Sequence, residues 1–250
     1  DVCFTWNGTT SGTRVPNGDW IPDNREGLVL CDATSAVFSQ RIDWKKLDAV
    51  TFSWQKTMGG EAGHGMLVLS PKAVCRLESY IPKRPLPKVF RLVKKGKLIE
   101  EIFSGETINT PSMLCVADAL DSLQWILGLG GLKTTITRAN SNFVTLQTWL
   151  DHQDWIENLV DVHSHRSNTS VCLRIVSKEF LHFSIKKQRF FVDHLVSLLE
   201  RESVAFDIAS HREAPPGLRI WCGATVENKD LCDLLPWLEW AFETSKLDFK

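Results

Sequence analysis

Polar side chains follow three of the strands that the sequence predicts in its first sixty residues. They are Thr9, Asp32 and the adjacent pair Gln55 and Lys56. In an open α/β sheet, ligands bind at the carboxyl ends of the strands. A lysine amine can form a Schiff base with a carbonyl group, and a carboxylate can keep a pyridine nitrogen protonated. Asp32 alone would suit a turn cap and Lys56 alone a solvated side chain, but together they predict a covalent cofactor site.

The segments around these two residues resemble a known enzyme class. Residues 31–35, which contain Asp32, and residues 53–60, which contain Lys56, resemble the cofactor core of the class V, fold type I aminotransferases. The resemblance implies pyridoxal 5′-phosphate as the cofactor. It also implies that Lys56 binds the cofactor covalently and moves the substrate proton, while Asp32 pairs with the pyridinium nitrogen.

Within this class, the chain is similar to phosphoserine aminotransferases. The similar segments are residues 7–12, 55–56, 106–111 and 211–219. The resemblance implies that Thr9 and Gln55 hydrogen-bond around the cofactor phosphate and the ring 3′-oxygen. It implies further that Asn109 and Thr110 reach the cofactor of a neighbouring subunit, so that the enzyme is a homodimer.

The same resemblance predicts a cationic substrate pocket. Arg219 would bind the α-carboxylate through its fork of donors, and His211 with Arg212 would bind a side-chain phosphate or carboxylate. The implied reaction is transamination between glutamate and 3-phosphohydroxypyruvate, which gives phosphoserine and 2-oxoglutarate in serine biosynthesis. The small-molecule partners are therefore these two amino acids and their keto acids.

Three other interpretations of the function stay open. A serine or alanine aminotransferase that uses glyoxylate or pyruvate would leave the charges of His211 and Arg212 without a partner. A cysteine desulfurase would need a mobile nucleophilic cysteine, whereas Cys75 falls in a helical pattern. A truncated α/β module that binds a partner, or nothing, would carry no cofactor.

Composition excludes several other classes. A formal net charge of −1 in 250 residues gives no general field that would attract nucleic acid or an anionic membrane. Seven scattered cysteines, an odd number, indicate neither a disulfide framework nor a metal site. His163 and His165 have no supporting ligand nearby, and the basic run at 83–97 indicates a surface excursion. Without a long apolar run or a signal-like start, we expect a cytoplasmic protein without a membrane segment.

The periodicity predicts an α/β protein with strands and helices alternating in both halves. We expect the C-terminal half of a fold type I large domain, mainly a parallel sheet with helices, over residues 1–139, and a smaller α+β domain over 140–250. The predicted strands are 2–6, 27–31, 49–53, 65–69, 170–176, 205–208 and 218–222. The predicted helices are 71–80, 111–127, 132–149, 186–202 and 228–245. The chain starts in an apolar run without an initiator Met, so we expect further sequence before residue 1, including the turn that cradles the cofactor phosphate.

Overall fold

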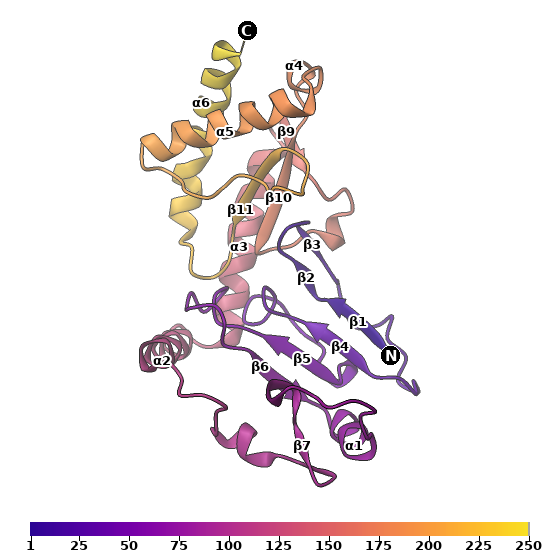
Figure 1. Ribbon diagram of the computed structural model, residues 1–250. Coiled ribbons are helices and arrows are strands. Elements are labelled where there is room, and N and C mark those ends of the chain that lie inside the picture. The colour runs from indigo at the N-terminus through magenta and orange to yellow at the C-terminus, as the bar shows by residue number, and fades with distance from the viewer. Residues whose placement is uncertain (250) are drawn as a thin grey trace.

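The computed structural model describes residues 1–249, which form two lobes joined by a long helix (Figure 1). The N-terminal lobe is built on a four-stranded sheet in the order β1-β4-β5-β6. Its strands are β1 Val2–Thr5, β4 Val29–Asp32, β5 Ala49–Phe52 and β6 Met66–Leu69. The first three are parallel, and β6 runs antiparallel to β5. The mainly parallel sheet predicted for this half is confirmed.

The register of the parallel strands brings their carboxyl ends to one edge of the sheet. Asp32 at the end of β4 lies between Thr5 of β1 and Thr51 of β5. The apolar side chains of β4 are buried at alternate positions, as expected for a strand with one face on a core. The segments that follow β1, β4 and β5 therefore all leave the sheet at the same edge.

Smaller elements surround this sheet. Helix α1, Pro71–Ser79, is capped by Ser70, whose hydroxyl accepts a hydrogen bond from the Ala73 N–H. A proline occupies its first turn. Two hairpins and three 3₁₀ turns complete the lobe. They are β2 Asn7–Gly8 with β3 Thr13–Arg14, β7 Val93–Lys94 with β8 Lys97–Leu98, η1 Trp44–Lys46, η2 Lys88–Phe90 and η3 Glu100–Ser104.

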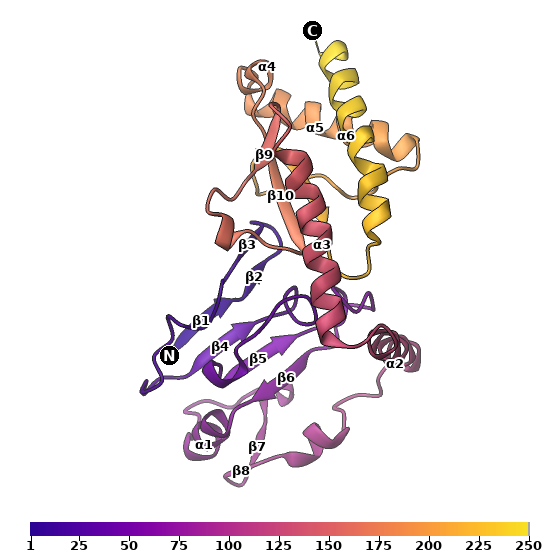
Figure 2. The same cartoon turned by 180° about the vertical axis from the view of Figure 1, so that it is seen from behind.

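Two helices follow and carry the chain into the second lobe (Figure 2). Helix α2, Met113–Gly128, ends before Gly130 and Gly131, both with positive φ, and α3, Leu132–Leu150, starts directly afterwards. Within residues 1–249, no single helix is long and apolar enough to span a membrane, and α2 and α3 would qualify only as a pair bent by 85°. The predicted division between residues 139 and 140 falls inside α3 and stays a prediction.

The C-terminal lobe packs helices against a three-stranded antiparallel sheet in the order β11-β10-β9. Its elements are β9 Ile156–Asn158, η4 His163–His165, β10 Ser170–Ile175, α4 Lys178–Leu181, α5 Ile185–Arg201, β11 Gly217–Trp221 and α6 Asn228–Asp248. Leu146 of α3, Leu195 of α5 and Leu238 of α6 are fully buried in the shared core. The five predicted helices match α1, α2, α3, α5 and α6 within three residues at each end, whereas the short α4 and β9 were missed.

The strand predicted at 205–208 is wrong. Asp207 has a left-handed backbone, with φ of 53°, which interrupts an extended run. The pairing occurs slightly later, where Ala209 forms an isolated antiparallel bridge with Leu218 of β11. Two backbone hydrogen bonds flank this bridge, from Arg219 N to Ile208 O (2.8 Å) and from Ser210 N to Gly217 O (2.9 Å).

A buried polar cluster joins the two lobes. The Gln40 amide donates to Asn7 Oδ1 (2.7 Å) in the N-terminal lobe and to Asn168 Oδ1 (2.8 Å) in the C-terminal lobe. Asn7 also donates to Thr169 Oγ1 (3.1 Å). Because all four residues are buried, these hydrogen bonds form out of reach of solvent and fix the lobes relative to each other.

Candidate active site

Lys56 lies in a tight turn that follows β5. The turn is closed by hydrogen bonds from Gly59 N to Lys56 O (2.9 Å) and from Gly60 N to Trp54 O (3.0 Å). The next residue, Thr57, is buried, and its hydroxyl is hydrogen-bonded to that of Ser39 at 2.6 Å. The backbone under Lys56 is therefore held rigidly while its side chain stays half-buried.

The C-terminal lobe covers the Lys56 side chain. Lys56 Nζ lies 5.6 Å from the centre of the Trp221 ring, at the end of β11. The indole folds over Gly223, where an added Cβ would come within 2.5 Å of the ring. A residue without a side chain is therefore needed at position 223 for Trp221 to keep this place.

The environment of Lys56 favours its neutral amine. Burial lowers the pKa of Lys56 below its ordinary value, and the positive charge of Arg219 lowers it further, while the carboxylate of Asp207 opposes the change. The neutral amine is the nucleophile that forms a Schiff base. A half-buried lysine with a lowered pKa at the end of a strand therefore has the chemistry predicted for Lys56.

Asp32 is exposed at the carboxyl end of β4. Its Oδ1 accepts hydrogen bonds from the N–H (2.9 Å) and the hydroxyl (2.6 Å) of Thr34, which orients the carboxylate as an Asx turn. Oδ2 accepts no hydrogen bond from residues 1–249, so it is available to a further donor. Asp32 and the Lys56 turn leave neighbouring strands at the same sheet edge.

The turn that contains Thr9 packs on the C-terminal lobe. Thr9 O accepts a hydrogen bond from the Ser170 hydroxyl (2.6 Å), and the Cys172 thiol donates to Thr10 O (3.4 Å). Cys172 pairs with Arg219 across β10 and β11. The Thr9 turn therefore packs on β10, the strand next to β11, which carries Arg219. Gln55, by contrast, is exposed, and its side chain makes no hydrogen bond within residues 1–249.

The three predicted substrate cations differ in their exposure and in their partners. Arg219 on β11 is mostly buried and pairs with Asp207, with 3.4 Å between Nη2 and Oδ2. His211 Nδ1 accepts a hydrogen bond from the Glu213 N–H (3.3 Å) in the loop before β11. The Arg212 side chain is 86% exposed, and its Nε lies 4.0 Å from Glu213 Oε1. Its guanidinium therefore points into solvent.

Asn109 and Thr110 are exposed in the segment between η3 and α2. Neither makes a hydrogen bond with another predicted site residue in the part of the chain that the structure describes. The structure thus brings Lys56, Arg219 and the Thr9 turn together at the junction of the lobes, and leaves Asn109 and Thr110 outside this group.

Trp221 and Asp207 were missed from the sequence. A signal for Trp221 was present, because residues two apart on a strand point to the same face, and Arg219 and Trp221 are both half-buried among buried neighbours in β11. No signal indicated Asp207, because its position depends on a left-handed backbone residue in a run that reads as a strand.

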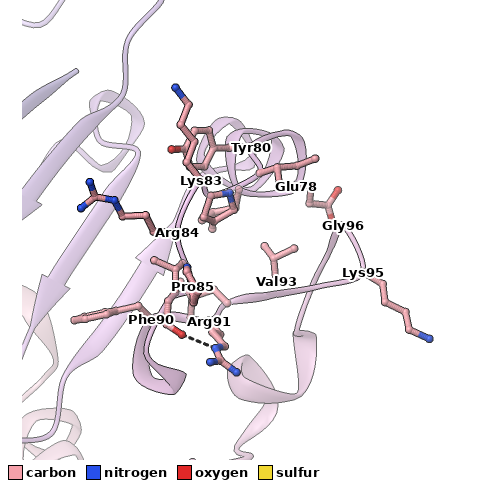
Figure 3. A pocket seen from close by; sticks show the side chains of 15 residues that line it. Glu78, Tyr80, Lys83, Arg84, Pro85, Phe90, Arg91, Val93, Lys95 and Gly96 are labelled. Carbon is pink, nitrogen blue, oxygen red and sulfur yellow. Dashed lines mark hydrogen bonds between the residues drawn. The ribbon is translucent and has the colours of Figure 1, made fainter.

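A separate cavity of about 960 Å³ lies among residues 77–96 and contains none of the predicted site residues (Figure 3). Lys83, Arg84 and Lys95 extend away from it, and Arg91 Nε donates to Leu86 O (2.6 Å). Its interior is therefore apolar and does not form an anion site. Within residues 1–249, no group of three or more potential ligands is placed to hold a metal ion.

Comparison with known proteins decides the family. The signature described as aminotransferase class-V matches residues 2–186. The chain belongs to the class V aminotransferase family. The family and the α/β fold predicted from the sequence are thereby confirmed.

Individual class V relatives extend this result. The chain is 56% identical to a phosphoserine aminotransferase of Methanosarcina mazei over 98% of its own length and 64% of that protein. It therefore spans somewhat less than two thirds of that relative.

Solved class V structures share the fold. The chain matches a phosphoserine aminotransferase from Cytophaga hutchinsonii with a TM-score of 0.74 at 18% identity, over 95% of this chain and 62% of the other. It also matches an alanine–glyoxylate aminotransferase from Nostoc sp. with a TM-score of 0.71 at 17% identity, over 96% and 60%. Similarity at this level shows the fold but does not select a substrate.

Proposed function

We propose that the protein containing this chain catalyses pyridoxal-phosphate-dependent transamination between glutamate and 3-phosphohydroxypyruvate, giving phosphoserine and 2-oxoglutarate. One observation carries the chemistry: Lys56 is a half-buried amine with a lowered pKa, at the sheet edge that also presents Asp32. The 56% identity to the M. mazei phosphoserine aminotransferase supports the choice of substrates.

The residues at this edge fit the cofactor. Lys56 offers a nucleophilic amine for the aldehyde, and Asp32 Oδ2 is available to accept a hydrogen bond from the protonated pyridine nitrogen and to keep that nitrogen charged. Thr9 and Gln55 would hydrogen-bond to the phosphate and to the ring 3′-oxygen. Bound pyridoxal phosphate supplies an electron-withdrawing ring that stabilises negative charge on the substrate carbon.

Lys56 then moves a proton. Its amine would take the proton from the substrate α-carbon, hold it at Nζ and release it on the side of the bound cofactor. The lowered pKa suits this role, because a general base near neutral pH must be unprotonated for part of the time. Trp221 covers one side of Nζ, with its ring centre 5.6 Å away.

Cations at the junction of the lobes would bind the substrate. Arg219, with most of its side chain buried, would take the α-carboxylate. His211 and Arg212 would take the phosphate of phosphoserine or the side-chain carboxylate of glutamate. Because Arg212 points into solvent here, this role requires it to turn toward the bound substrate.

We also propose that the enzyme is a cytoplasmic homodimer. Asn109 and Thr110 are exposed and free to contact the cofactor of a second subunit. All seven cysteines are unpaired, which suits a reducing compartment.

The Nostoc enzyme indicates the main alternative, a class V aminotransferase with a small neutral substrate. The two functions differ in what Arg212 does.

We would measure kcat/KM for phosphoserine, glutamate and alanine in Arg212→Ala and Arg219→Ala variants of the full chain. Arg212→Ala should lower the values for phosphoserine and glutamate about tenfold or more and spare alanine, since a charge-assisted contact is worth roughly 1.5–3 kcal/mol. Arg219→Ala should lower all three.

Equal losses for the three donors in the Arg212→Ala variant would reject the assignment of Arg212 to the side-chain phosphate or carboxylate and favour a general class V aminotransferase. No transfer with any donor by the intact, cofactor-loaded protein would reject the aminotransferase itself.

A further inference from the structure

We propose that Asp207 is an internal carboxylate that occupies Arg219 when no substrate is bound and is displaced by the substrate carboxylate. This inference rests on the proposed function, in which Arg219 binds the α-carboxylate. Asp207 would then set how tightly the site binds carboxylates, although it makes no contact with the bound substrate.

The ion pair has the geometry of a contact that is easily exchanged. Asp207 Oδ2 meets Arg219 Nη2 alone, at 3.4 Å, which is long for a charge-assisted hydrogen bond. A substrate carboxylate aligned with the guanidinium fork makes two shorter bonds. The incoming ligand therefore forms a better contact than the one it replaces.

The two partners also differ in their exposure. The Asp207 side chain is 92% exposed and that of Arg219 only 23%. The carboxylate already contacts water and loses little when it swings away, whereas the guanidinium is held in place on β11. Exchange thus moves only the aspartate side chain.

The backbone fixes Asp207 while leaving its side chain free. Ile208 is buried, and its carbonyl accepts the hydrogen bond from Arg219 N (2.8 Å), so the residue next to Asp207 is tied to the strand that carries Arg219. Asp207 itself has a φ of 53°, a conformation that aspartate, asparagine and glycine tolerate better than other residues. These anchors hold the carboxylate close to Arg219.

The charges around this pair explain why a carboxylate beside Arg219 is favourable when no substrate is bound. Lys56 is close enough for Arg219 and Asp207 to act on its charge in opposite directions. Two neighbouring cations repel each other, and a carboxylate close to both relieves part of the repulsion. When a substrate carboxylate replaces Asp207 at Arg219, the local charge balance is kept, whereas a ligand without a carboxylate cannot make the exchange.

Binding of glutarate tests this inference, because glutarate has the two carboxylates of the substrate but no amino or keto group to react. We would titrate it calorimetrically into the full chain loaded with cofactor. Asp207→Asn keeps the shape and the left-handed backbone but removes the charge, and should bind glutarate about two- to fivefold more tightly than the parent. Arg219→Gln should weaken binding about tenfold or more, and the double variant should gain nothing from the Asp207 change.

Glu202→Gln is the matched control, since it removes one carboxylate from the same loop at a residue that forms no ion pair within residues 1–249, and it should leave glutarate affinity unchanged. If Asp207→Asn unfolds, as judged by its thermal transition, Asp207→Gly provides the same loss of charge in a residue that also accepts positive φ.

The outcomes separate the two claims. Unchanged or weaker binding in both Asp207 variants, with weak binding in Arg219→Gln, overturns the role of Asp207 and leaves the proposed substrate site intact. Normal glutarate binding in Arg219→Gln overturns the assignment of Arg219 to the α-carboxylate, and with it both claims. An equal gain in Glu202→Gln would show a general charge effect and reject the specific exchange.

Discussion

The side-chain amine of Lys56 and the indole of Trp221 face each other across the junction of the two lobes, with Nζ 5.6 Å from the ring centre. The lysine follows a strand of the N-terminal sheet, and the tryptophan ends a strand of the C-terminal sheet. The environment of Lys56 is therefore supplied largely by the second lobe, through Trp221, Arg219 and Asp207.

The charges of the second lobe should control the reactivity of Lys56. Arg219 lowers the pKa of Lys56 and Asp207 raises it. In Arg219→Gln the pKa of Lys56 should rise, so that at a fixed pH less of the amine is neutral and reactive; in Asp207→Asn it should fall. The rate at which an amine reagent labels the peptide 53–58, measured by mass spectrometry across pH in the cofactor-free chain, checks both directions. Labelling curves that coincide with the parent's would show that neither charge acts on Lys56.

Gly223 should be essential for the position of Trp221. An alanine there places its Cβ within 2.5 Å of the indole, so the ring must move. We expect Gly223→Ala to lower the free energy of unfolding by about 1–3 kcal/mol, the usual cost of overpacking. Gly65→Ala is the control, because its Cβ meets nothing within 4 Å, and it should be close to neutral. Urea denaturation of both variants gives the comparison, and similar stabilities would contradict the packing described for Trp221.

The buried cluster around Gln40 should hold the lobes together. Gln40→Leu would leave the side-chain oxygens of Asn7 and Asn168 without this donor in a buried site. Each unsatisfied group costs about 1–3 kcal/mol, so the variant should lose several kcal/mol of stability. Faster amide exchange at residues 168–170, measured by mass spectrometry, would locate the loss at the junction. Unchanged exchange there would show that other contacts carry the connection.

The sequence predicted much of the fold because its signals are local. Short runs of apolar, strand-forming residues predicted the parallel strands at 2–6, 27–31 and 49–53, and the helix predicted at 71–80 begins at a proline, which the structure places in the first turn of α1. The strand predicted at 205–208 failed because the apolar residues on both sides of Asp207 suggest an extended run, and sequence pattern alone does not encode its positive φ. In the candidate site, Lys56 and Asp32 were singled out because they lie at or shortly after the ends of strands, within segments that resemble the family's cofactor core. Trp221 and Asp207 depend instead on how the lobes meet, a long-range relationship that no spacing along the chain expresses.

Borohydride trapping of the cofactor tests the central claim most directly, namely that Lys56 is the covalent attachment point. The full chain is loaded with pyridoxal phosphate, reduced and digested, and the peptides are analysed by mass spectrometry. We predict that the added mass appears on the peptide containing residues 53–58 and disappears in Lys56→Ala, while Lys72→Ala, which changes a lysine in α1, keeps it. Trapping at another lysine, or undiminished trapping in Lys56→Ala, would contradict the account.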